Sequence, residues 1–328
     1  MSFITKLITS SVVIALAGAG GLNYWSQQAI TTLEPALAFT ITPGSGAGAA
    51  GQEIHDAGAP LQPLLFNLLA RLTMQSARLK AGSYELKPGT TPMRLLEQLV
   101  RGEYAMASLT IIEGWTFRQM REALAANQAL RHDTAGLSDA ALMAQLSTHY
   151  QMPEGLFFPD TYLFPKGASD WQIYKPAHAM MMLHLSQAWS KRAPALPYKT
   201  PYEALIMASI IEKETGKKSE RSMIAGVFIN RLKAGMLLQT DPSVIYGMGN
   251  AYLGKIRKRD LEADSPYNTY IRAGLTPTPI ALPGLQSLTA AMAPAPTQAL
   301  YFVARGDGTS QFSGTLAAHN RAVNHYQR

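Results

Sequence analysis

The chain contains no cysteine among its 328 residues. Disulfide bonds, thiolate chemistry and a lipid anchor on an N-terminal cysteine are therefore excluded. Histidine is also scarce, with 7 residues and no pair at a metal-binding spacing, so we expect no metal and no cofactor. No zinc-finger, helix-turn-helix or RNA-binding signature is present, so we expect no nucleic-acid partner.

Charged residues are few, at 16% of the chain, and basic residues outnumber acidic ones to give a net charge of +7. Such an excess suits an anionic partner, for example anionic lipid or an acidic cell-wall polymer. Hydrophobic residues make up 47%, which is enough for a sizeable core, and the length is typical of about two domains.

The longest charge-free stretch lies near the N-terminus, between Lys6 and Glu34. Residues 7–25 come close to the roughly 20 residues that a helix needs to cross a bilayer. Because the next basic residue is Arg71, the positive-inside rule places residues 1–6 in the cytoplasm and the body outside. A cleaved signal peptide ending at residues 17–19 or 36–38 is the alternative, and we favour the uncleaved anchor.

A strand–turn–helix pattern recurs three times after this segment, over residues 39–55, 82–100 and 109–125. Each short β-like run ends in a turn and is followed by a stretch with helical periodicity, which indicates small α+β modules. A hairpin is predicted near the C-terminus, where residues 299–304 and 309–314 flank Gly306-Asp-Gly308.

Residues 200–216 read as one helix with both ends encoded. Thr200 and Glu203 form a capping box, and Gly216 favours a left-handed stop. Residues 204–211 are apolar on nearly every face, which predicts burial, and Glu212 follows at the rim of this core. Partial burial and the negative end of the helix should both raise the pKa of Glu212, as a general acid requires. A solvated helix end paired to a lysine is the alternative reading.

Three further segments carry polar and aromatic residues in turn-rich contexts. Residues 154–162 contain Glu154 and read as a loop lining a groove or as a packed connector. Asp241 precedes a proline, so it reads as a helix N-cap, a role that does not exclude lining a site. The third segment, residues 265–270, includes Tyr267 and Asn268.

These segments together resemble the endolytic murein transglycosylases of the YceG-like family. The matching motifs are Ala81–Tyr84, Ile112–Thr116, Glu154–Tyr162, Ala208–Thr215, Val227–Leu232, Leu238–Pro242, Val244–Gly247 and Tyr267–Tyr270. Their order and spacing fit from the anchor to Asn320. The chain departs from the family at residues 274–284, where Thr276 and Leu282 replace the usual proline and asparagine.

The resemblance implies an α+β fold with an N-terminal transmembrane helix at 7–25 and a LysM-like α+β module at 37–104. It also implies a connecting α+β region at 105–199 and a larger catalytic domain at 200–328. The body would face the periplasm from the inner membrane, near peptidoglycan synthases, and would cut nascent peptidoglycan strands. Glu212 takes the place of the family's catalytic glutamate, and we expect Gln239, Asp241, Tyr267, Asn268 and Glu154 to bind substrate.

A single carboxyl is enough when the substrate supplies its own nucleophile. The acid protonates the glycosidic oxygen, the C6 hydroxyl closes onto C1, and a 1,6-anhydro sugar forms without water. Two rival functions stay open. One is a hydrolytic muramidase that activates water with Asp241 or Glu220, and the other is a wall-binding scaffold with a degenerate site.

Overall fold

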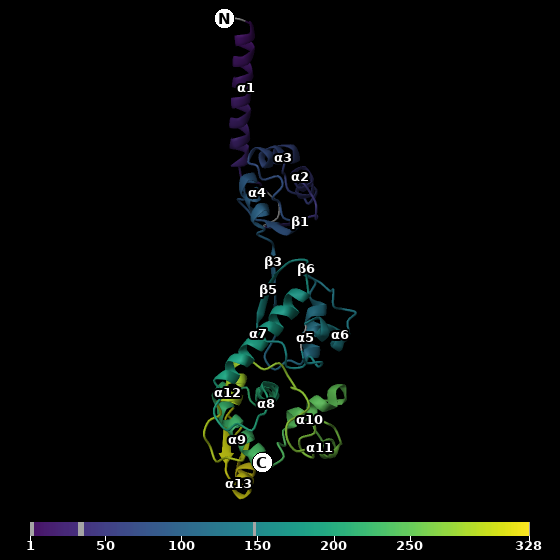
Figure 1. The fold of residues 1–328 in the computed structure, drawn as a ribbon, viewed down its shortest axis with the longest axis vertical. Helices are drawn as coiled ribbons and strands as arrows, with labels where there is room; N and C mark the ends of the chain where they lie inside the picture. Colours follow the sequence, from purple (N-terminus) through teal and green to yellow (C-terminus); the bar gives the residue numbers. More distant parts are fainter. Residues whose placement is uncertain (1–2, 32–35, 147–148, 328) are drawn as a thin grey trace. The chain divides into compact units, whose positions relative to one another are not determined.

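The computed structural model describes residues 3–31, 36–146 and 149–327, and Figure 1 shows its elements in chain order. The chain forms two compact units. The first comprises residues 1–108, 129–131 and 163–168, and the second comprises 109–128, 132–162 and 169–328. The region predicted to connect two domains, 105–199, is therefore divided between the units and lies mostly in the second.

Helix α1, Phe3–Ser26, covers the segment predicted to cross a membrane. Within the described residues, no helix combines the length and apolarity that crossing a membrane requires. The predicted transmembrane helix is thus not confirmed, and residues 1–2 of the predicted tail lie outside the described part.

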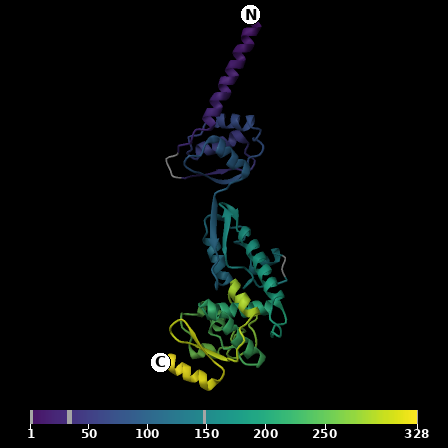
Figure 2. The ribbon, with the colours of Figure 1, turned by 90° about the vertical axis from the view of Figure 1, so that its left-hand side faces the viewer.

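The first unit contains β1 (Leu37–Ile41), α2 (Ala47–Asp56), α3 (Pro63–Leu72), β2 (Gly82–Leu86) and α4 (Pro92–Arg101). Strands β1 and β2 pair antiparallel, with Leu37 opposite Leu86. Alternate residues of the two strands, Phe39, Tyr84 and Leu86 among them, are buried in a core shared with the helices. Figure 2 shows the strands and helices of this unit in purple and blue, from a second side. The strand–turn–helix patterns predicted at 39–55 and 82–100 are confirmed.

The chain then forms β3 (Met106–Thr110), α5 (Phe117–Ala126), β4 (Leu130–Arg131), α6 (Asp139–Gln145), β5 (Thr161–Pro165), β6 (Ala168–Ser169) and α7 (Trp171–Ser190). Strand β3 pairs with β5, and β4 pairs with β6. Helix α5 begins with a full capping box between Thr116 and Gln119, so the third predicted strand–turn–helix unit is confirmed as well.

The core of the second unit is α8, Pro201–Glu214, whose residues 204–212 are all buried. Helices α7, α9 (Arg221–Lys233) and α12 (Leu285–Met292) pack around it. The remaining elements are α10 (Asp241–Met248), α11 (Lys258–Glu262), β7 (Tyr301–Ala304), β8 (Ser310–Ser313), α13 (Leu316–Tyr326) and the short 3₁₀ turns η1 (Lys218–Glu220) and η2 (Gly249–Ala251). Strands β7 and β8 form the predicted hairpin. The α+β fold class is confirmed.

Two predicted helix ends differ from the structure. The Thr200 hydroxyl accepts from Glu203 N as expected, but α8 ends in extended backbone at Thr215, so the left-handed stop at Gly216 was wrong. The cap of α10 is Thr240 in place of Asp241. The Asp241 carboxyl is thereby released from capping and is available for other contacts.

Candidate active site

A cleft of about 650 Å³ opens in the second unit at the C-terminal end of α8. It brings together Glu214, Arg231, Gln239, Asp241 and Tyr270 with Tyr301 of the hairpin and His319 and Asn320 of α13. The sequence placed Gln239 and Asp241 at a site, and the structure brings both to this cleft. Glu212 does not line it.

Glu214 supplies a carboxyl that suits proton transfer. Its carboxylate accepts a hydrogen bond from the Thr240 hydroxyl. Burial raises its pKa to about 7, the Thr240 bond opposes that rise, and the negative charge of Asp241 adds to it. Because an efficient general acid has a pKa near the working pH, Glu214 is chemically matched to this role.

Asp241 is the second carboxyl of the cleft. It is exposed, and its Oδ1 accepts a hydrogen bond of 2.5 Å from the Tyr270 hydroxyl. This contact fixes the Asp241 side chain in the same cleft as Glu214. The cleft therefore holds two carboxyls, Glu214 with a pKa near neutral pH and Asp241. Enzymes that cleave glycosidic bonds commonly use such a pair of carboxyls.

Gln239 sits in the cleft with a left-handed backbone, φ 50°, which is uncommon for a residue with a side chain. Its N–H donates to Thr269 O at 3.0 Å. Arg231 lies beneath and donates from Nη1 to Gln239 Oε1 at 3.3 Å and to Leu238 O at 2.9 Å. Two partners thus hold the exposed Gln239 in a conformation that costs free energy, as is common at binding sites.

Glu212 faces a different set of partners. Its side chain is 4% exposed, and Oε1 accepts from Arg221 Nη2 at 2.7 Å. Its other oxygen accepts from Gly284 N at 2.9 Å. The same Arg221 nitrogen lies 3.6 Å from Glu113 Oε2, whose side chain is 41% exposed. Glu212 is therefore one member of a buried ion cluster that ties α8 to α9 and to two loops.

The cleft offers Glu214 as a second candidate for the general acid, and the sequence's choice of Glu212 stays a prediction. Residues two apart on a helix point to nearly opposite sides, so Glu212 and Glu214 face different surroundings. The sequence argument placed Glu212 at the rim of the core and did not foresee that this cleft opens on the Glu214 side. It also missed Arg221 and Glu113, because their contacts join segments far apart in the chain.

The remaining predicted binding residues hold loops together. Asn268 is 1% exposed, and its Nδ2 donates to Leu261 O and Ala263 O. The Tyr267 hydroxyl bonds Thr278 Oγ1 at 2.9 Å. Both residues hold the conformation of the loop that carries Tyr270, and Tyr270 lines the cleft. In this structure they therefore position the site through the loop.

Glu154 is buried away from the cleft. Its carboxylate accepts from Phe117 N at 2.9 Å and from the Tyr246 hydroxyl at 3.0 Å, which joins the start of α5 to α10. Burial raises its pKa to about 7. Glu220, the other base considered for a hydrolase, accepts from Ser310 N and Oγ and so ties η1, just before α9, to the hairpin.

The loop at residues 274–284, where the sequence differs from the family pattern, is packed into the core. Leu282 is fully buried and exchanges two hydrogen bonds with the 113–116 turn, from its N to Trp115 O and from Gly114 N to its O. The Thr276 hydroxyl donates to Thr278 O. At position 282 the main chain makes both polar contacts, so a leucine side chain there fills the interior without leaving them unmade.

Among the described residues, no group of three or more His, Cys, Asp or Glu side chains could hold a metal ion. The cleft instead combines titratable carboxyls with amide, phenol and imidazole groups. A polar cleft with a carboxyl of raised pKa is a candidate site for acid–base chemistry.

Comparison with known proteins identifies the group to which this site belongs. Residues 39–325 match the YceG-like family. An endolytic murein transglycosylase from Bacillus subtilis is 35% identical over 75% of this chain and 73% of its own length. One from Streptococcus pneumoniae serotype 2 is 30% identical over 97% of this chain and 64% of its own length.

A crystal structure of a YceG-like protein from Listeria monocytogenes superposes with a TM-score of 0.56 at 30% identity. The match covers 88% of this chain and 98% of that protein. The chain therefore belongs to the YceG-like family.

Proposed function

We propose that this protein is an endolytic murein transglycosylase, which cuts the bond between N-acetylmuramic acid and N-acetylglucosamine inside peptidoglycan strands. Family membership and the activity named for its relatives support the reaction class. The observation that carries the residue assignment is Glu214, whose carboxyl lines the open cleft with a pKa near 7.

In the proposed reaction Glu214 transfers its proton to the glycosidic oxygen as the bond to C1 breaks. The leaving sugar departs with a hydroxyl, and the substrate's N-acetyl group relieves the positive charge that develops at C1. The Glu214 carboxylate then takes the proton of the C6 hydroxyl, whose oxygen closes onto C1. Glu214 ends protonated, no water is consumed, and the product carries a 1,6-anhydro end.

Asp241 contributes through its charge. As a neighbouring carboxylate it raises the pKa of Glu214 and so keeps the proton available at neutral pH. The same negative charge would stabilise the positive character at C1 in the transition state. This assignment uses Asp241 without making it a base, since the C6 hydroxyl replaces the water that a hydrolase must activate.

Cleavage within strands separates the enzyme from a wall-binding scaffold. The full chain is incubated with long, peptide-free glycan strands, and product lengths are followed by chromatography. An endolytic enzyme shortens the whole length distribution early, before disaccharides appear. A protein that binds the strands but leaves their lengths unchanged would be the scaffold, and stepwise release of disaccharides would contradict internal cutting.

From the resemblance we further propose that α1 attaches the protein to the inner membrane, with the body outside near peptidoglycan synthases and residues 37–104 acting as a LysM-like wall-binding module. Lys6 precedes residues 7–25 and the next basic residue is Arg71, which supports this orientation by the positive-inside rule. Recovery of the full chain in the membrane fraction, with residues beyond 34 open to external protease, is expected. A soluble protein beginning after residue 19 or 38 would instead show a cleaved signal peptide.

A further inference from the structure

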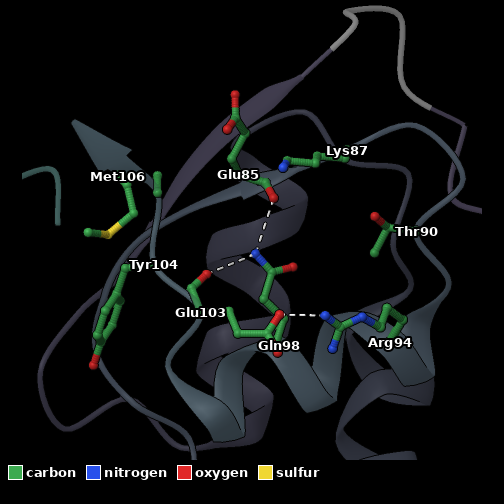
Figure 3. Close-up of a pocket in the computed structure, with 9 residues that line it drawn as sticks. Glu85, Lys87, Thr90, Arg94, Gln98, Glu103, Tyr104 and Met106 are labelled. Atoms are coloured by element: carbon green, nitrogen blue, oxygen red, sulfur yellow. Dashed lines mark hydrogen bonds and ion pairs between the residues drawn. The ribbon is translucent and has the colours of Figure 1, made fainter. Parts of the chain in front are cut away.

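A second pocket lies in the first unit, outside the cleft that holds Glu214. It encloses about 430 Å³, within the range of small-ligand sites. Its walls come from β2 and the turn after it, from α4, and from the segment leading into β3 (Figure 3). The charged side chains around it are Glu85, Lys87, Arg94 and Glu103.

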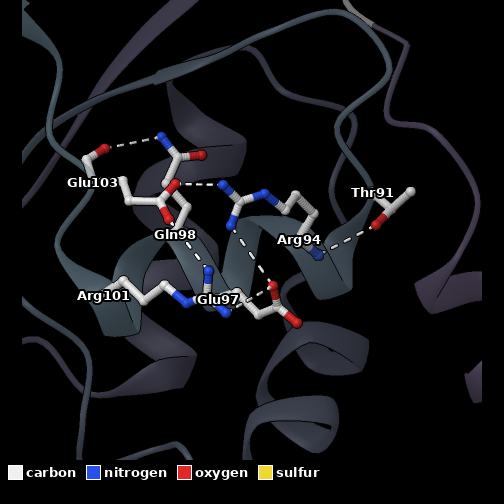
Figure 4. Close-up of polar contacts among 6 residues, drawn as sticks. All are labelled: Thr91, Arg94, Glu97, Gln98, Arg101 and Glu103. Atoms are coloured by element: carbon white, nitrogen blue, oxygen red, sulfur yellow. Dashed lines mark hydrogen bonds and ion pairs between the residues drawn. The ribbon is translucent and has the colours of Figure 1, made fainter.

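One wall carries an alternating network of charges on α4 and on Glu103 just after it, shown in Figure 4. Arg94 lies 2.5 Å from Glu103 and 3.6 Å from Glu97, and Arg101 lies 3.9 Å from Glu97 and 3.8 Å from Glu103. Gln98 adds two hydrogen bonds of 3.2 Å from its Nε2, to Glu85 O and Glu103 O. This wall is therefore organised before any ligand arrives.

The opposite wall carries charged side chains that have no partner among the described residues. Neither the Glu85 carboxylate nor the Lys87 ammonium has a hydrogen bond or ion pair within the described part of the chain, and the same holds for Gln98 Oε1. As far as the described residues go, the pocket thus offers one free anion, one free cation and one free amide acceptor. A ligand that satisfies all three has an ammonium, a carboxylate and an amide N–H.

The pocket is poorly suited to other common ligands. Its single aromatic lining residue, Tyr104, already packs against Tyr84 at 5.2 Å between ring centroids. A Cβ added at Gly82 or Gly102 would meet the Tyr104 ring at 2.7 or 3.2 Å, so the main chain also lies against this ring. Stacking of a sugar is therefore restricted, and the two carboxylates disfavour a polyanion.

We propose that this pocket binds a short zwitterionic peptide, the chemistry of the peptide side chains on peptidoglycan. The ligand's ammonium would bind Glu85, its carboxylate would bind Lys87, and an amide N–H would donate to Gln98 Oε1. The identity of the ligand rests on the proposed function, whereas the charge pattern does not. The pocket would select strands that still bear peptides, separately from the chemistry at Glu214.

The test measures binding of a disaccharide that carries one peptide to the full chain, by calorimetry. The disaccharide ends in N-acetylmuramic acid, so it lacks the bond from this sugar to a following N-acetylglucosamine that the enzyme would cut, and binding is separated from turnover. Acetylating the peptide amine, or replacing Lys87→Gln or Glu85→Gln, should weaken binding by about threefold to fivefold each, as partly exposed charge pairs do. Lys191→Gln removes an exposed positive charge from the second unit, outside both the pocket and the cleft, and should leave binding unchanged.

Lys87→Gln should also raise KM for peptide-bearing strands more than it raises KM for peptide-free strands. Equal affinity for the peptide-free disaccharide, indifference to amine acetylation, or no binding at all would each overturn the pocket proposal. None of these results would bear on whether the enzyme cuts strands. Absence of cleavage with intact peptide binding would instead overturn the proposed function and leave the pocket standing.

Discussion

The two glutamates at the end of α8 should respond in opposite ways to the same substitution. Glu214→Gln keeps the side-chain shape and removes the proton that the cleft needs. Loss of general acid catalysis costs typically about 10²–10⁴-fold, and loss of both proton transfers costs more. The fold should be retained, because Gln still accepts the hydrogen bond from Thr240.

Glu212→Gln should act mainly on stability. It removes the charge that pairs with Arg221 at 2.7 Å, and the guanidinium is 5% exposed, so a buried charge loses its main partner. Breaking such a pair costs about 3–5 kcal/mol. In a unit of this size that cost lowers Tm by roughly 6–20 °C. Glu113→Gln is the matched control, since its half-exposed carboxylate lies 3.6 Å from the same nitrogen and should cost under about 1 kcal/mol.

The assay is strand cleavage per folded molecule, with thermal unfolding measured on the same samples. Each variant is assayed below its own Tm, so that loss of folded protein is not scored as loss of catalysis. The reasoning fails if Glu214→Gln cleaves at near-normal rates, or if Glu212→Gln is as stable as the parent and inactive. The second outcome would restore Glu212 as the general acid.

Three further results are expected. Activity should fall as pH rises through about 7, because the acid Glu214 must be protonated. Asp241→Asn should move that fall to lower pH, since it removes a negative charge that raises the pKa of Glu214. An unchanged pH profile in this variant would refute the coupling between the two carboxyls. In the folded protein the pKa of Glu154 is raised to about 7, so its contribution to the free energy of unfolding is complete below its unfolded pKa and is lost as pH rises through 7. The loss between pH 5 and pH 8 is on the order of 2–3 kcal/mol. Denaturant unfolding at these two pH values should show a smaller loss for Glu154→Gln than for the parent. The Tyr270 N–H donates to Asn268 Oδ1 at 2.9 Å, so Asn268→Ala should misplace Tyr270 and lower kcat. A variant with normal kcat would show that the position of Tyr270 does not depend on this hydrogen bond.

Local patterns predicted the elements well. The cap at Thr200, the apolar run of α8, the three strand–turn–helix units and the C-terminal hairpin are encoded within short stretches of chain. Such signals depend on backbone hydrogen bonding and periodicity alone. Errors at Gly216 and Asp241 were displacements of one or two residues at helix ends, where tertiary contacts set the boundary.

The site was harder to predict because its decisive contacts are not local. Glu113 and Glu212 meet through Arg221, and Gly284 N completes the cluster from a distant loop. An arginine at the start of a helix has no sequence mark that identifies it as the partner of a buried carboxylate. The side of α8 on which the cleft opens depends on the hairpin and α13, which a helical period cannot reveal.

Mass analysis of the cut ends, with the reaction run in ¹⁸O-labelled water, tests the central claim most directly. Intramolecular closure predicts muramic ends that are lighter by one water than hydrolytic ends, resist borohydride reduction and contain no ¹⁸O. These ends should disappear with Glu214→Gln. Reducing muramic ends labelled with ¹⁸O as the main product would contradict the account and make Asp241 the base of a hydrolase.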